Sequence, residues 1–183
     1  GDVTLNPIKP EDLHALKDWM IVGPFDLGTT TKPPGDAKDP EASLPNFKAK
    51  LGPELDGVLD QKYQGKDGEI GWQAYHAQAE AVDLNQAFHE LDWAIGYGVA
   101  YIKSPDKRTV FAGIRGDDVT RLFVNGVELY TQWSGSSQLT YIDLPLNEGW
   151  NTVMVKCADY TGGWSYQLAV ENPKDELVFS YTK

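Results

Sequence analysis

The chain has 183 residues, the length of one domain, and its 16 basic and 27 acidic side chains give a formal net charge of −11 at pH 7. This charge repels nucleic acid backbones and anionic membranes, so we expect neither as a partner, and it favours neutral ligands over anionic polymers. We expect one domain over residues 1–183, excised from a larger multidomain protein.

The first part of the chain mixes predicted helices with predicted strands. A helix is predicted over residues 10–19, because a proline suits the first turn and Leu13, Leu16 and Trp19 recur at helical spacing. The other elements predicted before Gly96 are strands over 19–25 and 70–77 and a second helix over 78–91.

One long stretch, residues 26–68, has no regular pattern of apolar residues and holds many of the prolines, glycines and lysines. Loops of this length inside a compact domain are usually functional or mobile. We interpret the stretch as a surface loop held down by its own apolar residues, and the alternative is that it forms the wall of a binding site.

From Gly96 onward, strands recur at intervals of about 10 to 15 residues and are separated by Gly, Pro, Asp and Asn turns. The predicted strands cover residues 98–104, 108–116, 120–132, 139–146, 151–159, 165–172 and 176–182. This pattern is typical of an antiparallel β-sandwich or jelly roll. The single cysteine, Cys157, shares a strand face with valines and is expected to be a buried hydrophobe.

The sequence Asn125-Gly126 predicts a tight β-hairpin within residues 120–132. A two-residue turn places four apolar side chains on the core face, with Val124 opposite Val127 and Leu122 opposite Leu129. The other face then carries a mixed stripe, with Arg121 opposite Tyr130 and Phe123 opposite Glu128. Three interpretations of this stripe remain: a layer covered by residues 26–68, a solvated outer face, or a ligand-binding face.

Several segments resemble the galactose-binding-like jelly-roll modules attached to bacterial polysaccharide-degrading enzymes and related cell-surface proteins. They are "WMIVGPF" (19–25), "KYQGKDGEIGW" (62–72), the stretch from "GVAYIKSP" through "GDDVTRLFVNGVELY" (98–130), and "LNEGWNTVMVKCADYTGGWSYQLAV" (146–170). The resemblance implies an all-β antiparallel β-sandwich with jelly-roll topology. It also implies glycan binding without hydrolysis, or a scaffolding role beside a catalytic domain.

Sugar recognition needs an aromatic face for the C–H surface of a pyranose and planar polar groups for its hydroxyls. Two Gly-rich loops, "YTQWSGSSQ" and "ADYTGGWSY", supply aromatics that have no obvious core period. The predicted ligand-binding residues are Trp133, Trp164, Tyr160, Tyr130, Arg115 and Asp117. In the alternative, the tryptophans pack over an open end of the sandwich, and Asp117 and Asp118 only tighten a turn.

Nothing in the sequence singles out a catalytic site, and we expect the chain not to be an enzyme. Carboxylate pairs such as Glu54 with Asp56 occur in any acidic chain, and no recognisable zinc or Ser-His-Asp arrangement includes His14, His76 or His89. No cofactor is expected. The resemblance leaves one metal open, a structural Ca²⁺, because jelly-roll modules of this kind often carry one and turn carboxylates are abundant here.

The function predicted on these grounds is a secreted or cell-surface, bacterial, non-catalytic carbohydrate-binding module that targets a polysaccharide through aromatic stacking and polar loop contacts. Its expected partners are a neutral oligo- or polysaccharide and the catalytic domain of the parent protein. The alternative is a structural or protein-interaction module without a glycan site, followed by a jelly-roll lyase or hydrolase.

Overall fold

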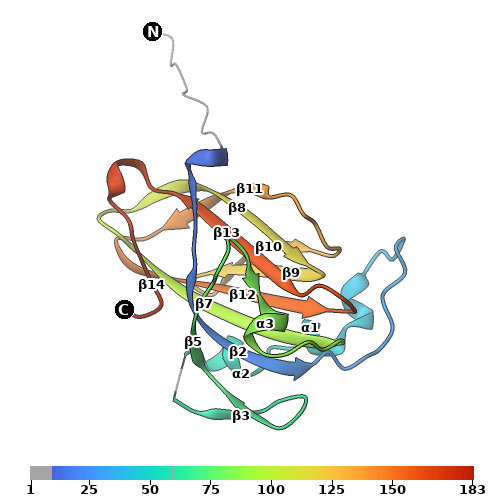
Figure 1. The fold of residues 1–183 in the computed structure, drawn as a ribbon. Helices are drawn as coiled ribbons and strands as arrows, with labels where there is room; N and C mark the ends of the chain where they lie inside the picture. Colours follow the sequence, from blue (N-terminus) through green and yellow to red (C-terminus); the bar gives the residue numbers. More distant parts are fainter. Residues whose placement is uncertain (1–9, 59) are drawn as a thin grey trace.

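A computed structural model of the chain describes residues 10–58 and 60–183. Two antiparallel sheets pack face to face as a β-sandwich, in agreement with the predicted fold class (Figure 1). No helix in the described ranges is long and apolar enough to cross a membrane.

The first sheet holds five strands. Its order is β1 (Leu13–Ala15), β13 (Ser165–Glu171), β8 (Arg108–Asp117) and β11 (Thr140–Leu146), and β6 (Val82–Asp83) pairs with β13. The second sheet has the order β10 (Val127–Gln132), β9 (Val119–Val124), β12 (Gly149–Asp159), β7 (Ala94–Ser104), β2 (Asp18–Asp26) and β5 (Gln73–His76), and β14 (Val178–Ser180) pairs with β7.

The remaining elements are short. A two-stranded ribbon consists of β3 (Lys62–Gln64) and β4 (Glu69–Gly71), and the α-helices are α1 (Pro45–Lys48), α2 (Gly52–Asp56) and α3 (Leu84–Ala87). Single 3₁₀ turns cover Pro10–Asp12, Pro40–Ser43 and Pro173–Asp175. The two sheets therefore form most of the structure, and the helices are short segments within the connections between strands.

The core lies between the two sheets and follows the alternation of the strands. Leu122, Val153, Val155 and Leu168 are fully buried in one cluster, and Val124 is 3% exposed there. Cys157 joins the same cluster as a buried free thiol, as its strand position predicts.

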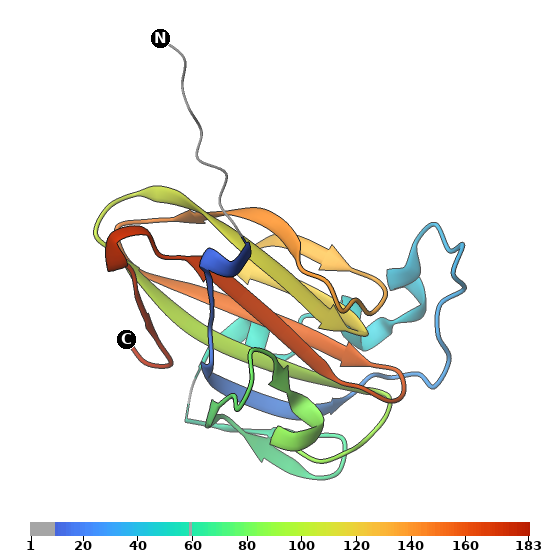
Figure 2. The ribbon, with the colours of Figure 1, turned by 45° about the horizontal axis from the view of Figure 1, so that its top comes forward.

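A second apolar layer lies on the outer face of the second sheet and includes Leu27, Leu44 and Phe47 of residues 27–58, which we call the covering segment. Figure 2 shows the first loop of this segment extending past the edge of the sandwich. Leu44 and Phe47 of this segment are fully buried against Tyr97 and Val99 of β7. The interpretation of a loop held down by its own apolar residues is therefore confirmed. Of the stripe on the hairpin, the segment covers Arg121, while Phe123 is half-buried and Glu128 is exposed.

The predicted hairpin register holds only near the turn. Val124 pairs with Val127 and Phe123 with Glu128, but a bulge between Glu128 and Tyr130 places Tyr130 opposite Leu122. The predicted Leu122–Leu129 and Arg121–Tyr130 pairs are thus wrong, because one extra residue on a bulged strand shifts the alternation. Val127, expected in the core, is 63% exposed on the edge strand β10.

The predicted helix over residues 10–19 is also wrong. After one 3₁₀ turn the chain enters β1, and β2 begins at Asp18. Leu16 and Trp19 are buried in the core from extended backbone, so a three-residue spacing does not require a helix here. Of the second predicted helix, over 78–91, only α3 is helical, and it is capped by the Asp83 carboxylate, which accepts from the Gln86 N–H.

The difference in burial between Leu122 and Val127 leads to a paired test of the hairpin. We expect Leu122→Ala to lower the free energy of unfolding by about 2–5 kcal/mol, the usual range for truncating a buried leucine. Val127→Ala should change it by less than about 0.5 kcal/mol, because that side chain is exposed. Urea denaturation of both variants measures the difference, and equal losses would contradict the exposed position of Val127 on β10.

Candidate functional site

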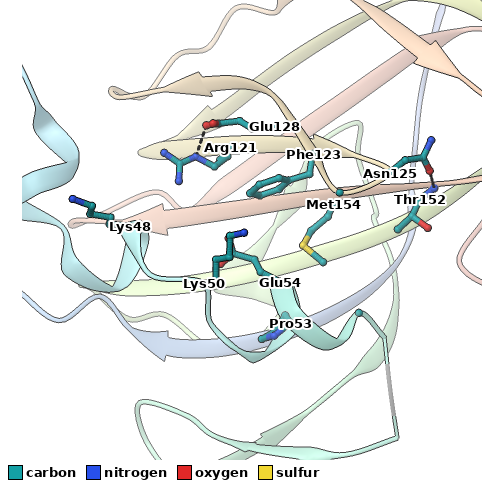
Figure 3. Close-up of a pocket in the computed structure, with 12 residues that line it drawn as sticks. Lys48, Lys50, Pro53, Glu54, Arg121, Phe123, Asn125, Glu128, Thr152 and Met154 are labelled. Carbon is teal, nitrogen blue, oxygen red and sulfur yellow. Dashed lines mark hydrogen bonds and ion pairs between the residues drawn. The ribbon is translucent and has the colours of Figure 1, made fainter.

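A pocket of about 540 Å³ opens on the outer face of the second sheet, between the covering segment and the β9–β10 hairpin (Figure 3). We call it the sheet-face pocket. The covering segment contributes Lys48, Lys50, Pro53 and Glu54, and the strands contribute Arg121, Phe123, Glu128, Thr152 and Met154. Its volume lies within the range of about 300–1,000 Å³ typical of small-molecule sites.

The floor of the pocket is apolar. Phe123 of β9 and Met154 of β12 are register partners, so both project from the same outer face of the sheet. Figure 3 shows the two side chains adjacent at the centre of the pocket. A ring beside a polarizable thioether forms a surface suited to the apolar face of a ligand.

A buried ammonium fixes the wall opposite the hairpin. Lys156 of β12 is fully buried, and its Nζ donates to the carbonyl oxygens of Phe47 and Ala49, both at 2.8 Å, and to Oε2 of Glu54 at 2.7 Å. Burial lowers the pKa of Lys156, and the Glu54 carboxylate opposes this shift. The Tyr97 hydroxyl also donates to Glu54, so helix α2 is held to the sheet by two hydrogen bonds.

A second cation links the hairpin to the covering segment. The Arg121 guanidinium lies 2.7 Å from Glu128 of β10 and 3.0 Å from Glu41 of the segment. It also lies 4.7 Å from the centroid of the Phe47 ring. Arg121 therefore closes one end of the pocket and joins strands to segment.

Two predicted ligand-binding aromatics are placed where they cannot stack on a ligand. Trp164 is fully buried in the core, and its indole N–H donates to the Cys157 carbonyl. Tyr160 is 6% exposed, beside the Trp93 ring and with the Lys32 ammonium 5.6 Å from its centroid. The expectation of exposed stacking platforms at these two positions is wrong, since both close an end of the sandwich.

The other predicted residues do not meet in one cleft. Trp133 is half-buried with its ring edge-on to Phe47, and Tyr130 packs against the core while its hydroxyl donates to Thr140 Oγ1. Arg115 and Asp117 line a separate polar hollow of about 410 Å³ together with Asp118, Gly135, Ser136 and Ser137. Arg115 is oriented there by donating to Gln167 Oε1 at 2.9 Å.

Behind this hollow, three aspartates form a carboxylate cluster. Asp118 accepts from the Tyr160 N–H at 2.7 Å, as expected of a turn cap. Asp159 is fully buried, and within the described residues neither of its oxygens has a hydrogen-bond partner. Burial, with the adjacent Asp118 carboxylate, raises the pKa of Asp159 to about 8, and the same causes raise that of Asp117 to about 6.

A buried carboxylate such as Asp159, which has no donor among the described residues and lies beside the Asp118 carboxylate, requires either a proton or a cation. Oxygen donors of this kind suit Ca²⁺, which accepts flexible coordination. The calcium ion implied by the resemblance stays a prediction, and Asp117, Asp118 and Asp159 are the carboxylates on which a calcium titration can test it. As the side chains stand, no three His, Cys, Asp or Glu groups in the described part of the chain already form a metal site.

Sequence reasoning missed most of these positions. Glu54, Lys48 and Lys50 lie in the stretch without an apolar pattern, and only the structure places them against the sheet. Lys156 had one visible signal, a lysine between Val155 and Cys157 in an otherwise apolar strand. A charge in such a strand predicts a buried partner on the covered face.

No family model and no curated protein matches the chain. Among solved structures it is similar to a family 35 carbohydrate binding module from an environmental isolate, at 17% identity and a TM-score of 0.36, over 45% of this chain and 68% of that one. It is also similar to the GH31 alpha-xylosidase from Xanthomonas citri, at 11% identity and a TM-score of 0.49, over 94% of this chain and 18% of the enzyme. For the PA14 domain of the MpAFP antifreeze protein the identity is 10% and the TM-score 0.43, over 97% of this chain and 92% of that domain.

The matching structures thus include carbohydrate binding modules and a glycoside-degrading enzyme. At these identities and TM-scores the likenesses assign the chain neither a family nor a ligand. What the chain binds must follow from its own site residues.

The carboxylate cluster predicts an unusual pH dependence. Without calcium, the free energy of unfolding should fall as pH rises from about 4 to about 8, because folded Asp159 retains a proton that the unfolded chain releases near pH 4. The slope for this one proton is at most about 1.4 kcal/mol per pH unit. Asp159→Asn, which keeps the shape and removes the charge, should flatten this slope. Thermal unfolding across that pH range measures it.

Calcium provides the second readout of the same cluster. Added Ca²⁺ should raise the melting temperature of the wild type at pH 8 and leave Asp159→Asn unchanged. Asp143→Asn, at an exposed position of β11, is the control and should behave as the wild type. A rise of equal size in all three proteins would show that calcium acts elsewhere.

Proposed function

We propose that this chain is a non-catalytic carbohydrate-binding module whose sugar site is the sheet-face pocket. The observation that carries the proposal is the apolar floor of Phe123 and Met154 inside a ring of polar and charged side chains. A pyranose has the complementary form, because its C–H face is apolar and its rim of hydroxyls both donates and accepts hydrogen bonds. Phe123 would cover the ring face.

The polar rim is preorganised by contacts within the protein. The Asn125 side-chain oxygen accepts from the Thr152 N–H at 3.0 Å, and its Nδ2 donates to Asn151 at 2.8 Å. Figure 3 shows the Asn125–Thr152 bond at the end of the pocket opposite Arg121. Side chains held in place before binding lose less conformational entropy when a ligand arrives.

The carboxylates of the pocket support binding rather than hydrolysis. A glycosidase needs one protonated carboxyl and one free carboxylate on either side of the scissile bond. Here Glu54 is bound to the buried Lys156 and Glu128 to Arg121, so each serves a structural ion pair. In this proposal the module acts outside the cell, bringing a catalytic domain of its parent protein to a polysaccharide, with calcium in a structural role.

A different surface favours the second candidate function, a protein-interaction module. On the outer face of the first sheet, Phe111 of β8 and Tyr141 of β11 stack with ring centroids 5.2 Å apart and an interplanar angle of 16°. Tyr141 is 44% exposed. Exposed stacked aromatics are common anchors in protein interfaces, so this pair gives the two functions separate surfaces.

Truncating the pocket floor tests the proposal. Phe123→Ala should weaken saccharide binding by about 2 kcal/mol, a loss of roughly 30-fold in affinity, because it removes the aromatic surface. Tyr141→Ala is the matched control on the other sheet and should bind as the wild type. Affinity electrophoresis against a panel of neutral and acidic polysaccharides, followed by calorimetry, measures both. Loss of binding in Tyr141→Ala alone would move the site to the other face.

A further inference from the structure

The sheet-face pocket differs in charge from the rest of the molecule. Three cations and two carboxylates line it, in a chain whose formal net charge is −11. A locally positive cavity in an acidic protein creates a short-range field opposite to the long-range one. The average charge of the chain therefore does not describe what this cavity attracts.

Ion pairing within the protein leaves two of these charges free. Glu54 is paired with Lys156, and Arg121 is paired with both Glu41 and Glu128. Lys48 and Lys50 take part in no ion pair among the described residues. With the pairing partners Lys156 and Glu41 included, four cations face three carboxylates, so the pocket keeps a net charge of +1, and Lys48 and Lys50 are its two cations outside the ion pairs.

The backbone that carries both lysines is held in place. Lys48 and Lys50 alternate with Phe47 and Ala49, whose carbonyl oxygens accept from the buried Lys156 ammonium. Both lysine side chains are exposed, and Figure 3 shows them on the covering-segment side of the pocket, across from the hairpin. Figure 3 shows the two side chains apart from one another, and four rotatable carbons let each ammonium group reach an anion at its own part of the rim.

We infer that the sheet-face pocket selects saccharides that carry an anionic group, a carboxylate or a sulfate, and that Lys48 and Lys50 bind this group. The inference rests on the proposed function, since it names the ligand class of the same site. Phe123 covers the sugar ring while the lysines contact its charged substituent. This replaces the preference for neutral ligands that the total charge suggested.

The two-part site separates ring binding from charge recognition. The apolar floor acts equally on a charged sugar and on its uncharged ester, whereas the lysines act only on the charged form. Attraction between the anion and exposed lysines is screened by salt, so the preference should shrink as ionic strength rises. Binding of the ester should not depend on salt.

The test compares trigalacturonate with its methyl ester by calorimetry at 20 mM and 300 mM NaCl, and a sulfated galactose oligosaccharide with its desulfated form. The wild type should bind at least one acidic form about tenfold or more tightly than its uncharged counterpart at low salt. Lys48→Ala/Lys50→Ala should abolish this preference and leave affinity for the uncharged form unchanged. Lys107→Ala/Lys174→Ala, which removes the same charge at exposed positions elsewhere, should retain it.

The outcomes separate the two levels of the proposal. If the wild type binds uncharged saccharides as tightly as acidic ones, or if the Lys48/Lys50 variant keeps the preference, the inference is wrong while saccharide binding stands. If no saccharide binds, both are wrong. An unchanged melting temperature of the Lys48/Lys50 variant shows that a lost preference is not a folding defect, because both side chains are exposed.

Discussion

A single buried ammonium determines how this sandwich differs from a bare pair of sheets. Lys156 lies in the middle of β12, with Tyr97 and Arg121 as its register partners on the flanking strands. Burying an unpaired ammonium is costly, so the chain must bring acceptors to it. The covering segment supplies two carbonyls and the Glu54 carboxylate, and by doing so it is drawn onto a sheet face that would otherwise be solvated.

The pocket is a consequence of this attachment. Leu44 and Phe47 are fully buried against the sheet. Nearer the hairpin turn the segment does not cover the sheet completely, and Phe123 and Met154 form the floor of the pocket. Arg121 marks the boundary between the two regions, because its guanidinium touches Phe47 on one side and lines the cavity on the other. The same sheet face therefore contributes both to the packed interior and to the pocket, and Arg121 lies between these two regions.

The structure follows the sequence-based predictions where the local alternation of apolar residues matches the burial of their side chains. The alternation in residues 151–159 correctly assigns Val153, Val155 and Cys157 to the core, and Asn125-Gly126 correctly locates the hairpin turn. The bulge after Glu128 was not predictable, because it depends on neighbouring strands and not on the local sequence. Everything beyond it along β10 shifted by one position.

The site was less predictable for a different physical reason. The Gly-rich, aperiodic surroundings of Trp164 predict a ligand platform, yet its side chain is fully buried. One tryptophan buries enough apolar surface to close the end of a sandwich without any pattern around it. Conversely, the pocket wall comes from a segment whose position is set by a contact over a hundred residues away in sequence, between Lys156 and Phe47. Such contacts leave no periodic trace in a single sequence.

The covering segment is attached to the sheet in a way that allows its outward-facing side chains to change without loss of the fold. The pairings of β9 with β12 and of β12 with β7 are made entirely between strands, so the sheet does not depend on the side chains that the segment turns outward. Residues such as Lys48 and Lys50 can be exchanged while the ammonium anchor beneath them is kept. The core of the sandwich then stays the same while the residues of the pocket wall vary. New ligand preferences can therefore be engineered by substituting residues of one short segment, without redesigning the core.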